Sequence, residues 1–293
     1  MKWDTQHPGR LLSELGLSPR RRLGQNFLHE RNIARKIVSL ALRMGPPFLE
    51  IGPGLGALTD LLAEKGQKTV AVEVDRGLAA YLRGRYEGIS VEIVAADFLA
   101  LPDEEWEKRF PEGGTVVGNL PFAVSSPILL RLMDLREIFP SAVLMMQKEV
   151  VERLCAPPGG KAYGILSVYL AVLSEIREEF TVRRTCFFPS PEVDSAVVSI
   201  RFRPGISNET FRGLQAVVRA AFARRRKTLR NAPVPFLRGG TPDWCGLLAG
   251  AEIDPSSRAE TVAPERYMEL ARLAEPLIPP ESPSKPGQED CRR

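Results

Sequence analysis

The amino-acid sequence predicts an α/β protein in which a parallel β-sheet is followed by a smaller, all-helical domain. Three observations lead to this prediction. A strand pattern runs through a glycine-rich turn into a helical pattern at Phe48–Thr59. Apolar strand patterns that end in an acidic residue recur at Thr69–Asp75 and Val91–Asp97. Strand patterns stop near Pro204, and helical patterns continue to about Glu275.

The glycine-rich turn Gly52-Pro53-Gly54-Leu55-Gly56 indicates a ligand site. Its three glycines permit sharp backbone turns and leave no side chain between the backbone and a ligand. The helix that follows directs its N-terminal N–H groups and the positive end of its dipole toward the same crevice. A nucleotide-like cofactor at the carboxyl edge of a Rossmann-like sheet fits this pattern. A tight strand–helix turn without a ligand is the alternative.

The spacing of the glycines narrows the choice of cofactor. The pattern E-x-G-x-G-x-G, which begins at Glu50, resembles motif I of the class I S-adenosylmethionine-dependent methyltransferases, whereas a dinucleotide fingerprint reads G-x-G-x-x-G. Glu73, 17 residues after Gly56, is placed to accept hydrogen bonds from two ribose hydroxyls. Asp97, at the end of the next strand, is placed to hold an adenine amino group. Acids at strand ends also serve as helix caps, which is the plainer interpretation.

Composition limits the function classes. The chain has 293 residues, a net charge of +4, four cysteines and two histidines. No C-x-x-C pair occurs, so we expect neither a metal site nor a disulfide framework. The N-terminus lacks an apolar signal core, and no apolar run is long enough to span a bilayer. We therefore expect a cytoplasmic protein without a membrane partner.

Four regions follow from the patterns along the chain. We expect an N-terminal leader at 1–22, a Rossmann-like domain at 23–204, a helical domain at 205–275 and a disordered, proline-rich tail at 276–293. Apolar residues at helical spacing predict helices at about 30–44, 103–110, 124–135, 148–154 and 163–174. Short apolar runs predict further strands at 115–122, 142–147, 180–182 and 195–202.

The tetrad Asn119-Leu120-Pro121-Phe122 follows the fourth strand and carries the predicted chemistry. The lone pair of an exocyclic amine of a base is delocalised into the ring, so that amine is a poor nucleophile. The Asn119 side-chain oxygen and the Leu120 carbonyl could both accept from its N–H groups and expose the lone pair. Pro121 stiffens the turn, and Phe122 offers a face on which a base can stack. An ordinary strand-end turn is the alternative.

A second aromatic residue, Phe187, precedes the proline-stiffened stretch Phe188-Pro189-Ser190-Pro191. It could clamp the other face of an extruded base. The pattern supports a buried loop anchor equally well.

The basic element is Arg224-Arg225-Arg226-Lys227. It lies in a stretch, residues 210–242, that holds eight Arg or Lys and no Asp or Glu. A segment of one sign in a nearly neutral protein is typical of a surface that binds a polyanion, so we expect these four residues to bind RNA. A solvated helix face is the alternative.

These motifs together resemble the ribosomal RNA adenine dimethyltransferase family over about residues 23–273. The matching stretches are Gly24–Leu28, Glu50–Gly56, Gly118–Pro121, Gln147–Val151, Lys161–Gly164, Pro191–Val197, and Arg225–Thr228 with Asn231. The resemblance implies transfer of methyl groups from S-adenosylmethionine to N6 of two adjacent adenosines in the 3′-terminal hairpin of 16S rRNA, within the immature small ribosomal subunit. It also implies that a monomer does so.

The resemblance assigns further residues to the cofactor. Asn26 and Leu28 are expected to line its site with Gly52, Gly54, Glu73, Asp97 and Asn119. One position departs from the family pattern, because Phe122 stands where tyrosine is usual and lacks its hydroxyl. Three alternatives stay open: the antibiotic-resistance type that acts on 23S rRNA, a ribosome-assembly factor for which catalysis is secondary, and an NAD-dependent dehydrogenase.

Overall fold

A computed structural model describes residues 7–232 and 243–277. Their contacts divide the chain into two units. The first comprises the described residues up to Val151 together with Arg177–Phe202, and the second comprises Glu152–Ile176 and the described residues from Arg203 onward. The tail predicted at 276–293 lies, except for its first two residues, outside the described part.

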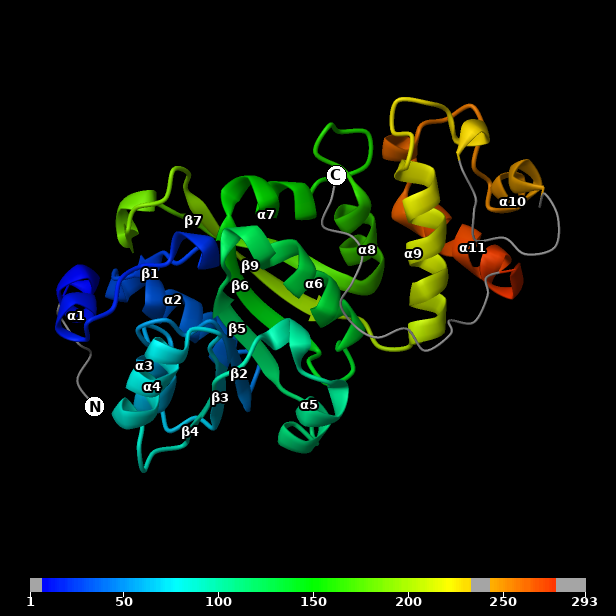
Figure 1. Cartoon of the computed structure of the whole chain (residues 1–293). Helices are drawn as coiled ribbons and strands as arrows, with labels where there is room; N and C mark the ends of the chain where they lie inside the picture. Colours follow the sequence, from blue (N-terminus) through cyan, green and yellow to red (C-terminus); the bar gives the residue numbers. More distant parts are fainter. Residues whose placement is uncertain (1–6, 233–242, 278–293) are drawn as a thin grey trace. The chain divides into compact units, whose positions relative to one another are not determined.

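A seven-stranded sheet forms the frame of the first unit, in the order β4-β3-β2-β5-β6-β9-β7 (Figure 1). The first five strands are parallel, and β9 is antiparallel to β6. Their bounds are β2 Phe48–Ile51, β3 Thr69–Val72, β4 Val91–Val94, β5 Thr115–Asn119, β6 Ser141–Gln147, β7 Ser174–Val182 and β9 Ser195–Phe202.

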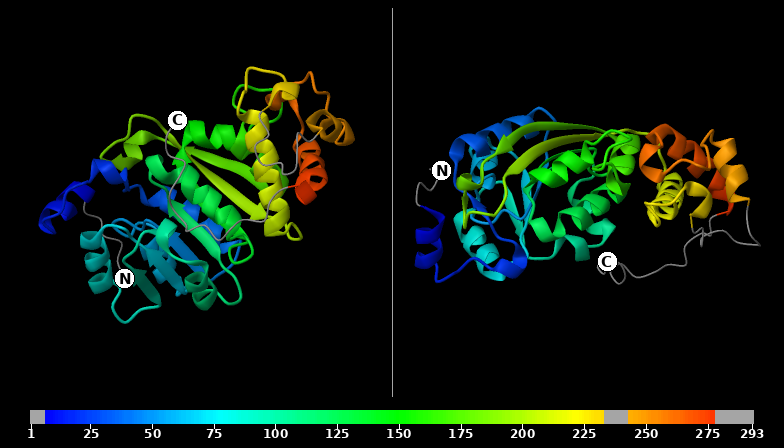
Figure 2. Two further views of the ribbon diagram at one scale, coloured as in Figure 1. Left: turned by 45° about the vertical axis from the view of Figure 1, so that its right-hand side comes forward. Right: turned by 90° about the horizontal axis from the view of Figure 1, so that it is seen from above.

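Helices lie on both faces of this sheet (Figures 1 and 2). In the first unit they are α1 Pro8–Glu14, α2 Arg31–Leu42, α3 Thr59–Glu64, α4 Arg76–Arg85, α5 Asp103–Arg109 and α6 Ser125–Asp134, followed by α7 Lys148–Leu154 at the boundary between the units. The helices predicted near 30–44, 103–110, 124–135 and 148–154 are therefore confirmed.

The strand order creates a crevice. From β2 the chain proceeds to β3 and β4 on one side, and then returns to place β5 and β6 on the other side. The carboxyl ends of β2 and β5 therefore diverge at a topological switch point, the place where open α/β sheets bind ligands. Both the glycine-rich turn and the Asn119 tetrad follow these two strands.

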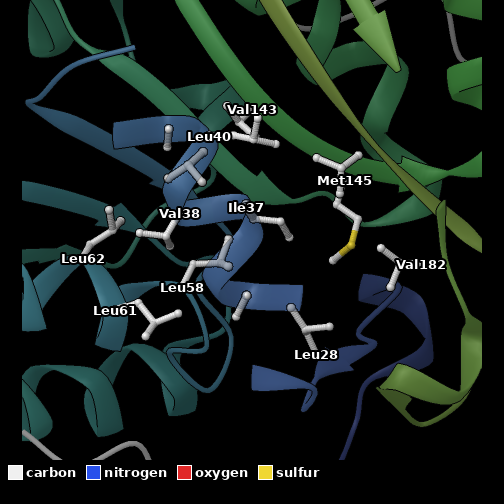
Figure 3. Close-up of a cluster of buried hydrophobic side chains, with 14 of the residues drawn as sticks. Leu28, Ile37, Val38, Leu40, Leu58, Leu61, Leu62, Val143, Met145 and Val182 are labelled. Carbon is white, nitrogen blue, oxygen red and sulfur yellow. The ribbon is translucent and has the colours of Figure 1, made fainter. Parts of the chain in front are cut away.

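A cluster of buried side chains fixes α2 against the sheet. Ile37 and Val38 on α2 pack with Leu62 of α3 and with Val143 and Met145 of β6 (Figure 3). The apolar residues of α2 recur at helical spacing, so one face is buried while the other stays polar. This packing holds the start of the chain beside the glycine-rich turn.

A short ribbon joins two segments that are distant in the sequence. Strand β1, Phe27–Leu28, pairs antiparallel with β8, Phe187–Phe188, and Leu28 stands opposite Phe187. Two-residue strands show no periodicity, so the sequence pattern did not predict this ribbon.

The second unit is built on helices α8 Ile165–Leu173, α9 Asn208–Phe222, α10 Trp244–Gly250 and α11 Pro264–Ala274. Helix α8 packs against α9 and α11. Its sequence is apolar on nearly every side, as expected of a helix with neighbours all round. The predicted boundary at 204–205 keeps α8 with the sheet, whereas the contacts group it with the C-terminal helices.

Within the described residues, we find no helix with the length and apolarity that crossing a membrane requires.

Candidate functional site

A pocket opens where β2, β3 and β5 end, and it contains about 780 Å³ of atom-free space, part of it open to solvent. The lining residues are Leu23, Gly24, Gln25, Asn26, Phe27, Leu28, Glu50, Gly52, Pro53, Gly54, Leu55, Ala57, Leu58, Glu73, Val74, Leu78, Asn119, Leu120, Pro121 and Phe122. All of them belong to the first unit.

The glycine-rich turn adopts a backbone that only glycine takes easily. Gly54 has φ +60° and Gly56 has φ +89°, both in the left-handed region. A Cβ on Gly56 would lie 2.4 Å from the Tyr86 hydroxyl oxygen, so this position also has no room for a side chain. Gly52 and Gly54 of this turn line the pocket at the end of β2.

Glu73 lies at the end of β3 and is 4% exposed. Its carboxylate accepts hydrogen bonds from the backbone N–H groups of Gly54 at 3.1 Å and Asp75 at 2.9 Å. Burial raises the pKa of Glu73, and the two hydrogen bonds oppose that rise. The acid predicted for the ribose therefore lies on the pocket wall, fastened to the glycine-rich turn.

The Asn119 side chain points its amide in a defined direction. Its Nδ2 donates to the backbone carbonyl of Asn26 at 2.9 Å. Within the described residues, its Oδ1 accepts no hydrogen bond. The backbone N–H of Leu120 donates to the Met145 carbonyl at 2.9 Å, which fixes the turn that follows β5. An acceptor oxygen is thus available on a rigid support.

The rest of the tetrad completes this wall. Pro121 lies close to the N-terminal segment. If Gly24 carried a Cβ, that atom would be 3.3 Å from the Pro121 Cβ. Phe122 is partly buried and begins a 3₁₀ turn, Phe122–Val124. An aromatic face therefore borders the opening next to the Asn119 amide.

The N-terminal segment is fastened over the pocket by polar contacts. The backbone N–H of Arg20 donates to Gln25 Oε1 at 2.8 Å, and Gln25 Nε2 donates to Asp75 Oδ2 at 3.3 Å. Arg20 Nε also lies 3.2 Å from Asp75 Oδ2. The stretch Gly24–Leu28 thereby becomes one wall of the pocket, a role that pattern reading alone did not assign to it.

Two predicted residues lie elsewhere. Asp97 is exposed, does not line the pocket, and accepts at 2.9 Å from the Leu99 backbone N–H at the start of a 3₁₀ turn. Phe187 is 4% exposed and packs in the core cluster of Figure 3, opposite Leu28. Its position is that of the buried loop anchor, because its ring is covered by core side chains.

Sequence reasoning missed apolar residues of the pocket. Val74 lies between Glu73 and Asp75, lines the pocket and is 50% exposed. Leu55 and Leu78 also line the pocket. An apolar residue next to an acid at a strand end was a usable signal for the pocket. A valine at such a position lies beyond the buried strand, so it is available to contact a ligand.

Glu50, the acid that opens motif I, is 1% exposed at the floor of the pocket. The Thr59 hydroxyl donates to its Oε2 at 2.6 Å. Burial raises the pKa of Glu50 to about 8, and the carboxylates of Asp60 and Glu73 act in the same direction.

The basic element lies in the second unit, where its members have different roles. Arg225 donates to the backbone carbonyls of Lys161 and Tyr163 and forms an ion pair of 3.2 Å with Glu260. It therefore connects three parts of that unit. All four members are exposed, and Arg225 differs from Arg224, Arg226 and Lys227 in these contacts. Within the described residues, no group of three metal-ligating side chains is placed to hold a metal.

Comparison with known proteins gives a consistent result. A sequence model of the family described as "Ribosomal RNA adenine dimethylase" matches residues 16–274. A protein of Magnetococcus marinus named "Ribosomal RNA small subunit methyltransferase A" is 40% identical over 94% of this chain and 99% of its own length. A protein of Pelotomaculum thermopropionicum with the same name is 43% identical over 87% of this chain and 91% of its own length.

Solved structures share the fold. A dimethyladenosine transferase from Plasmodium falciparum superposes with a TM-score of 0.72 at 24% identity, over 86% of this chain and 99% of that chain. The 23S rRNA methyltransferase ErmE superposes with a TM-score of 0.60 at 27% identity, over 85% of this chain and 99% of that chain. The Rossmann-like methyltransferase sheet predicted from the sequence is confirmed.

Proposed function

The chain belongs to the ribosomal RNA adenine dimethylase family, and from this premise we propose what its pocket does. The protein is an enzyme that uses S-adenosylmethionine to dimethylate N6 of adenosines in 16S rRNA of the small ribosomal subunit. The targets are two adjacent adenosines of the 3′-terminal hairpin. The observation that carries this proposal is the Oδ1 of Asn119, which accepts no hydrogen bond within the described residues and lies in the wall of the pocket.

The residues present fit S-adenosylmethionine. Glu73 offers carboxylate oxygens for ribose hydroxyls, and the exposed Val74 offers an apolar face for the purine. Asn26, Leu28, Gly52 and Gly54 line the remaining wall. When bound, the cofactor supplies an electrophilic methyl group. Asp97 accepts from the Leu99 backbone N–H through Oδ1 alone, and we propose that its carboxylate also accepts from the adenine amino group.

Asn119 and its neighbours prepare the target amine. The Asn119 Oδ1 and the Leu120 carbonyl accept from the two N–H groups of the adenine N6, which draws that nitrogen toward tetrahedral geometry. The exposed lone pair would accept the methyl group that the cofactor supplies, and the cofactor's sulfur would keep the bonding electron pair. Phe122 stacks on the base and holds it in line, so positioning supplies much of the acceleration. The excess proton leaves to solvent.

The exposed basic residues Arg224, Arg226 and Lys227 bind rRNA phosphates. Arg225 supports this surface structurally, because its guanidinium is held by Lys161, Tyr163 and Glu260. We propose the immature small subunit as the physical substrate, since an adenosine pair near an RNA terminus must be reachable before assembly closes around it.

The protein acts as a monomer in the cytoplasm under this proposal. The four scattered cysteines suit a reducing compartment. Light scattering of the purified protein at working concentration tests the monomer, and a mass of twice the chain would contradict it.

Two comparisons separate this function from its rivals. Titration with S-adenosylhomocysteine and with NAD should give binding of the first alone. Methyl transfer should proceed to small subunits that lack the adenine marks and not to large subunits. Transfer to 23S rRNA would favour the antibiotic-resistance reaction, which the likeness to ErmE keeps under consideration. Binding to small subunits without transfer would favour an assembly factor.

A further inference from the structure

The buried carboxyl of Glu50 has no assigned role in methyl transfer. It is 1% exposed, lines the floor of the pocket and accepts hydrogen bonds from Thr59 alone, from its hydroxyl at 2.6 Å and from its backbone N–H, within the described residues. An ionised carboxylate in such a place needs a cation or several donors to compensate for lost hydration.

The charged groups around Glu50 do not supply that cation. Strand β3 contributes Glu73 and α3 contributes Asp60, and both raise the pKa of Glu50. On α4, Arg85 is bound to Asp60 through contacts of 3.0 and 2.8 Å, and the Tyr86 hydroxyl donates to the same carboxylate at 2.7 Å.

The cation of the N-terminal segment is also paired with an acid. Arg20 forms its ion pair with Asp75, at 3.2 Å. In the described part of the chain, Glu50 and Glu73 therefore both lack an ion-pair partner, while the pocket above them is built for a ligand. Burial raises the pKa of Glu50 to about 8, so this carboxyl is mostly protonated at neutral pH in the cofactor-free protein.

We propose that Glu50 is a proton-linked counter-charge: it is neutral in the cofactor-free protein and ionises when a positively charged cofactor binds. This inference rests on the proposed function, because it takes the ligand to be S-adenosylmethionine. The step is the loss of one proton from the Glu50 carboxyl to solvent, and no other bond changes. Two cationic groups of the cofactor could draw it out, the ammonium and the sulfonium.

Calorimetric titration of the full chain with S-adenosylmethionine tests this at neutral pH. The measurement is repeated in buffers of different ionisation enthalpy, so that the number of protons released is obtained directly. The matched control is Glu50→Gln, which keeps an acceptor for Thr59 and cannot ionise. We expect wild type to release most of one proton more than Glu50→Gln. Equal proton release by the two proteins would overturn the proposal.

A second ligand identifies the source of the charge. S-adenosylhomocysteine has the ammonium but not the sulfonium. If the difference between wild type and Glu50→Gln persists with S-adenosylhomocysteine, the ammonium ionises Glu50. If the difference appears with S-adenosylmethionine alone, the sulfonium does, and the pocket then distinguishes cofactor from spent product by charge.

A second variant keeps the test available if Glu50→Gln does not fold. The Thr59 hydrogen bond lowers the pKa of Glu50, so Thr59→Val should raise that pKa further. The pH at which binding releases half a proton should then lie higher in Thr59→Val than in wild type. Coincident curves for the two proteins would overturn the proposal.

Failure of this inference differs from failure of the proposed function. If the chain binds S-adenosylmethionine and methylates rRNA without proton release from Glu50, only the present inference is wrong. If it neither binds the cofactor nor transfers methyl groups, the proposed function itself is wrong.

Discussion

Asn119 Nδ2 donates a hydrogen bond to the backbone carbonyl of Asn26 at 2.9 Å, across 93 positions of the sequence. This contact fixes which end of the amide faces the pocket. Since the NH₂ group is occupied by Asn26, the oxygen is the end left for a ligand. An accepting oxygen is what an adenine amine requires, so the N-terminal segment positions the group that we assign to catalysis.

Asn119→Ala should therefore abolish methyl transfer while cofactor binding persists. Loss of one oriented hydrogen-bonding group typically lowers kcat by about 100-fold or more. Transfer of labelled methyl groups and titration with S-adenosylhomocysteine measure the two effects. Asn32→Ala, at an exposed position of α2, is the matched control. Near-normal turnover of Asn119→Ala would refute the mechanism.

Gly56→Ala should disrupt the cofactor site more than Gly66→Ala. Both glycines have positive φ, +89° and +65°, so an alanine is strained at either by about 1–2 kcal/mol. Only at Gly56 would the new Cβ meet an atom, the Tyr86 hydroxyl at 2.4 Å, whereas nothing lies within 4 Å at Gly66. We expect a weaker affinity for S-adenosylmethionine in the first variant alone. Equal affinities would contradict the close approach.

The stability of the cofactor-free protein should fall with rising pH because of Glu50. Its pKa is raised from 4.5 to about 8, so the folded state binds more protons than the unfolded state across this interval. The free energy of unfolding then decreases as pH rises, by at most about 1.4 kcal/mol per pH unit for one proton.

Glu50→Gln should lack this component. The Tm of Glu50→Gln relative to that of wild type should increase between about pH 5 and pH 8. Above that range the Tm difference between the two proteins should stay constant. Thermal denaturation at a series of pH values measures both proteins. Parallel curves would show that Glu50 ionises normally.

Neutralising Arg224, Arg226 and Lys227 together should weaken binding to the small subunit and leave Tm unchanged. Each lost phosphate contact reduces the slope of log K against log salt by about 0.7–0.9. Arg225→Ala should behave differently and lower Tm by a few degrees, because its contacts with Lys161, Tyr163 and Glu260 are lost. Filter binding at several salt concentrations distinguishes the triple variant from Arg225→Ala. If the slope of log K against log salt is unchanged in the triple variant, these three residues do not bind phosphates and are only solvated.

Substitution of the two phenylalanines should likewise have different effects, on stability at Phe187 and on activity at Phe122. Phe187→Ala should cost about 3–5 kcal/mol of stability, because the ring is buried in the core. Phe122→Ala should leave Tm nearly unchanged and lower kcat/KM for rRNA, since stacking is worth about 1–3 kcal/mol per base. Phe122→Tyr is the conservative control. A stable, impaired Phe187→Ala would restore that residue as a stacking candidate.

Local signals in the sequence predicted much of the fold. The helix over Arg31–Leu42 was expected from its apolar spacing, and Glu30 caps it as the first residue of the predicted range. The glycine spacing and the acid at Glu73 located the pocket, because strand ends and tight turns are determined by residues that are neighbours in the sequence.

Features that depend on distant partners were harder to predict. Strand β7 is longer than the expected 180–182, since an edge strand tolerates the charged residues of Glu175–Glu179 that obscure a strand pattern. The ribbon of β1 and β8 links segments with no local signature. The same reason applies to Phe187 and Arg225, because only tertiary packing distinguishes a core aromatic from a stacking one, or a structural arginine from a phosphate-binding one.

The most direct test is transfer of labelled methyl groups from S-adenosylmethionine to small ribosomal subunits that lack the adenine marks, followed by mass mapping of the rRNA. We predict dimethyladenosine at two adjacent positions of the 3′-terminal hairpin, and none with Asn119→Ala. Methylation at another site, or binding of the subunits without transfer, would contradict the assignment.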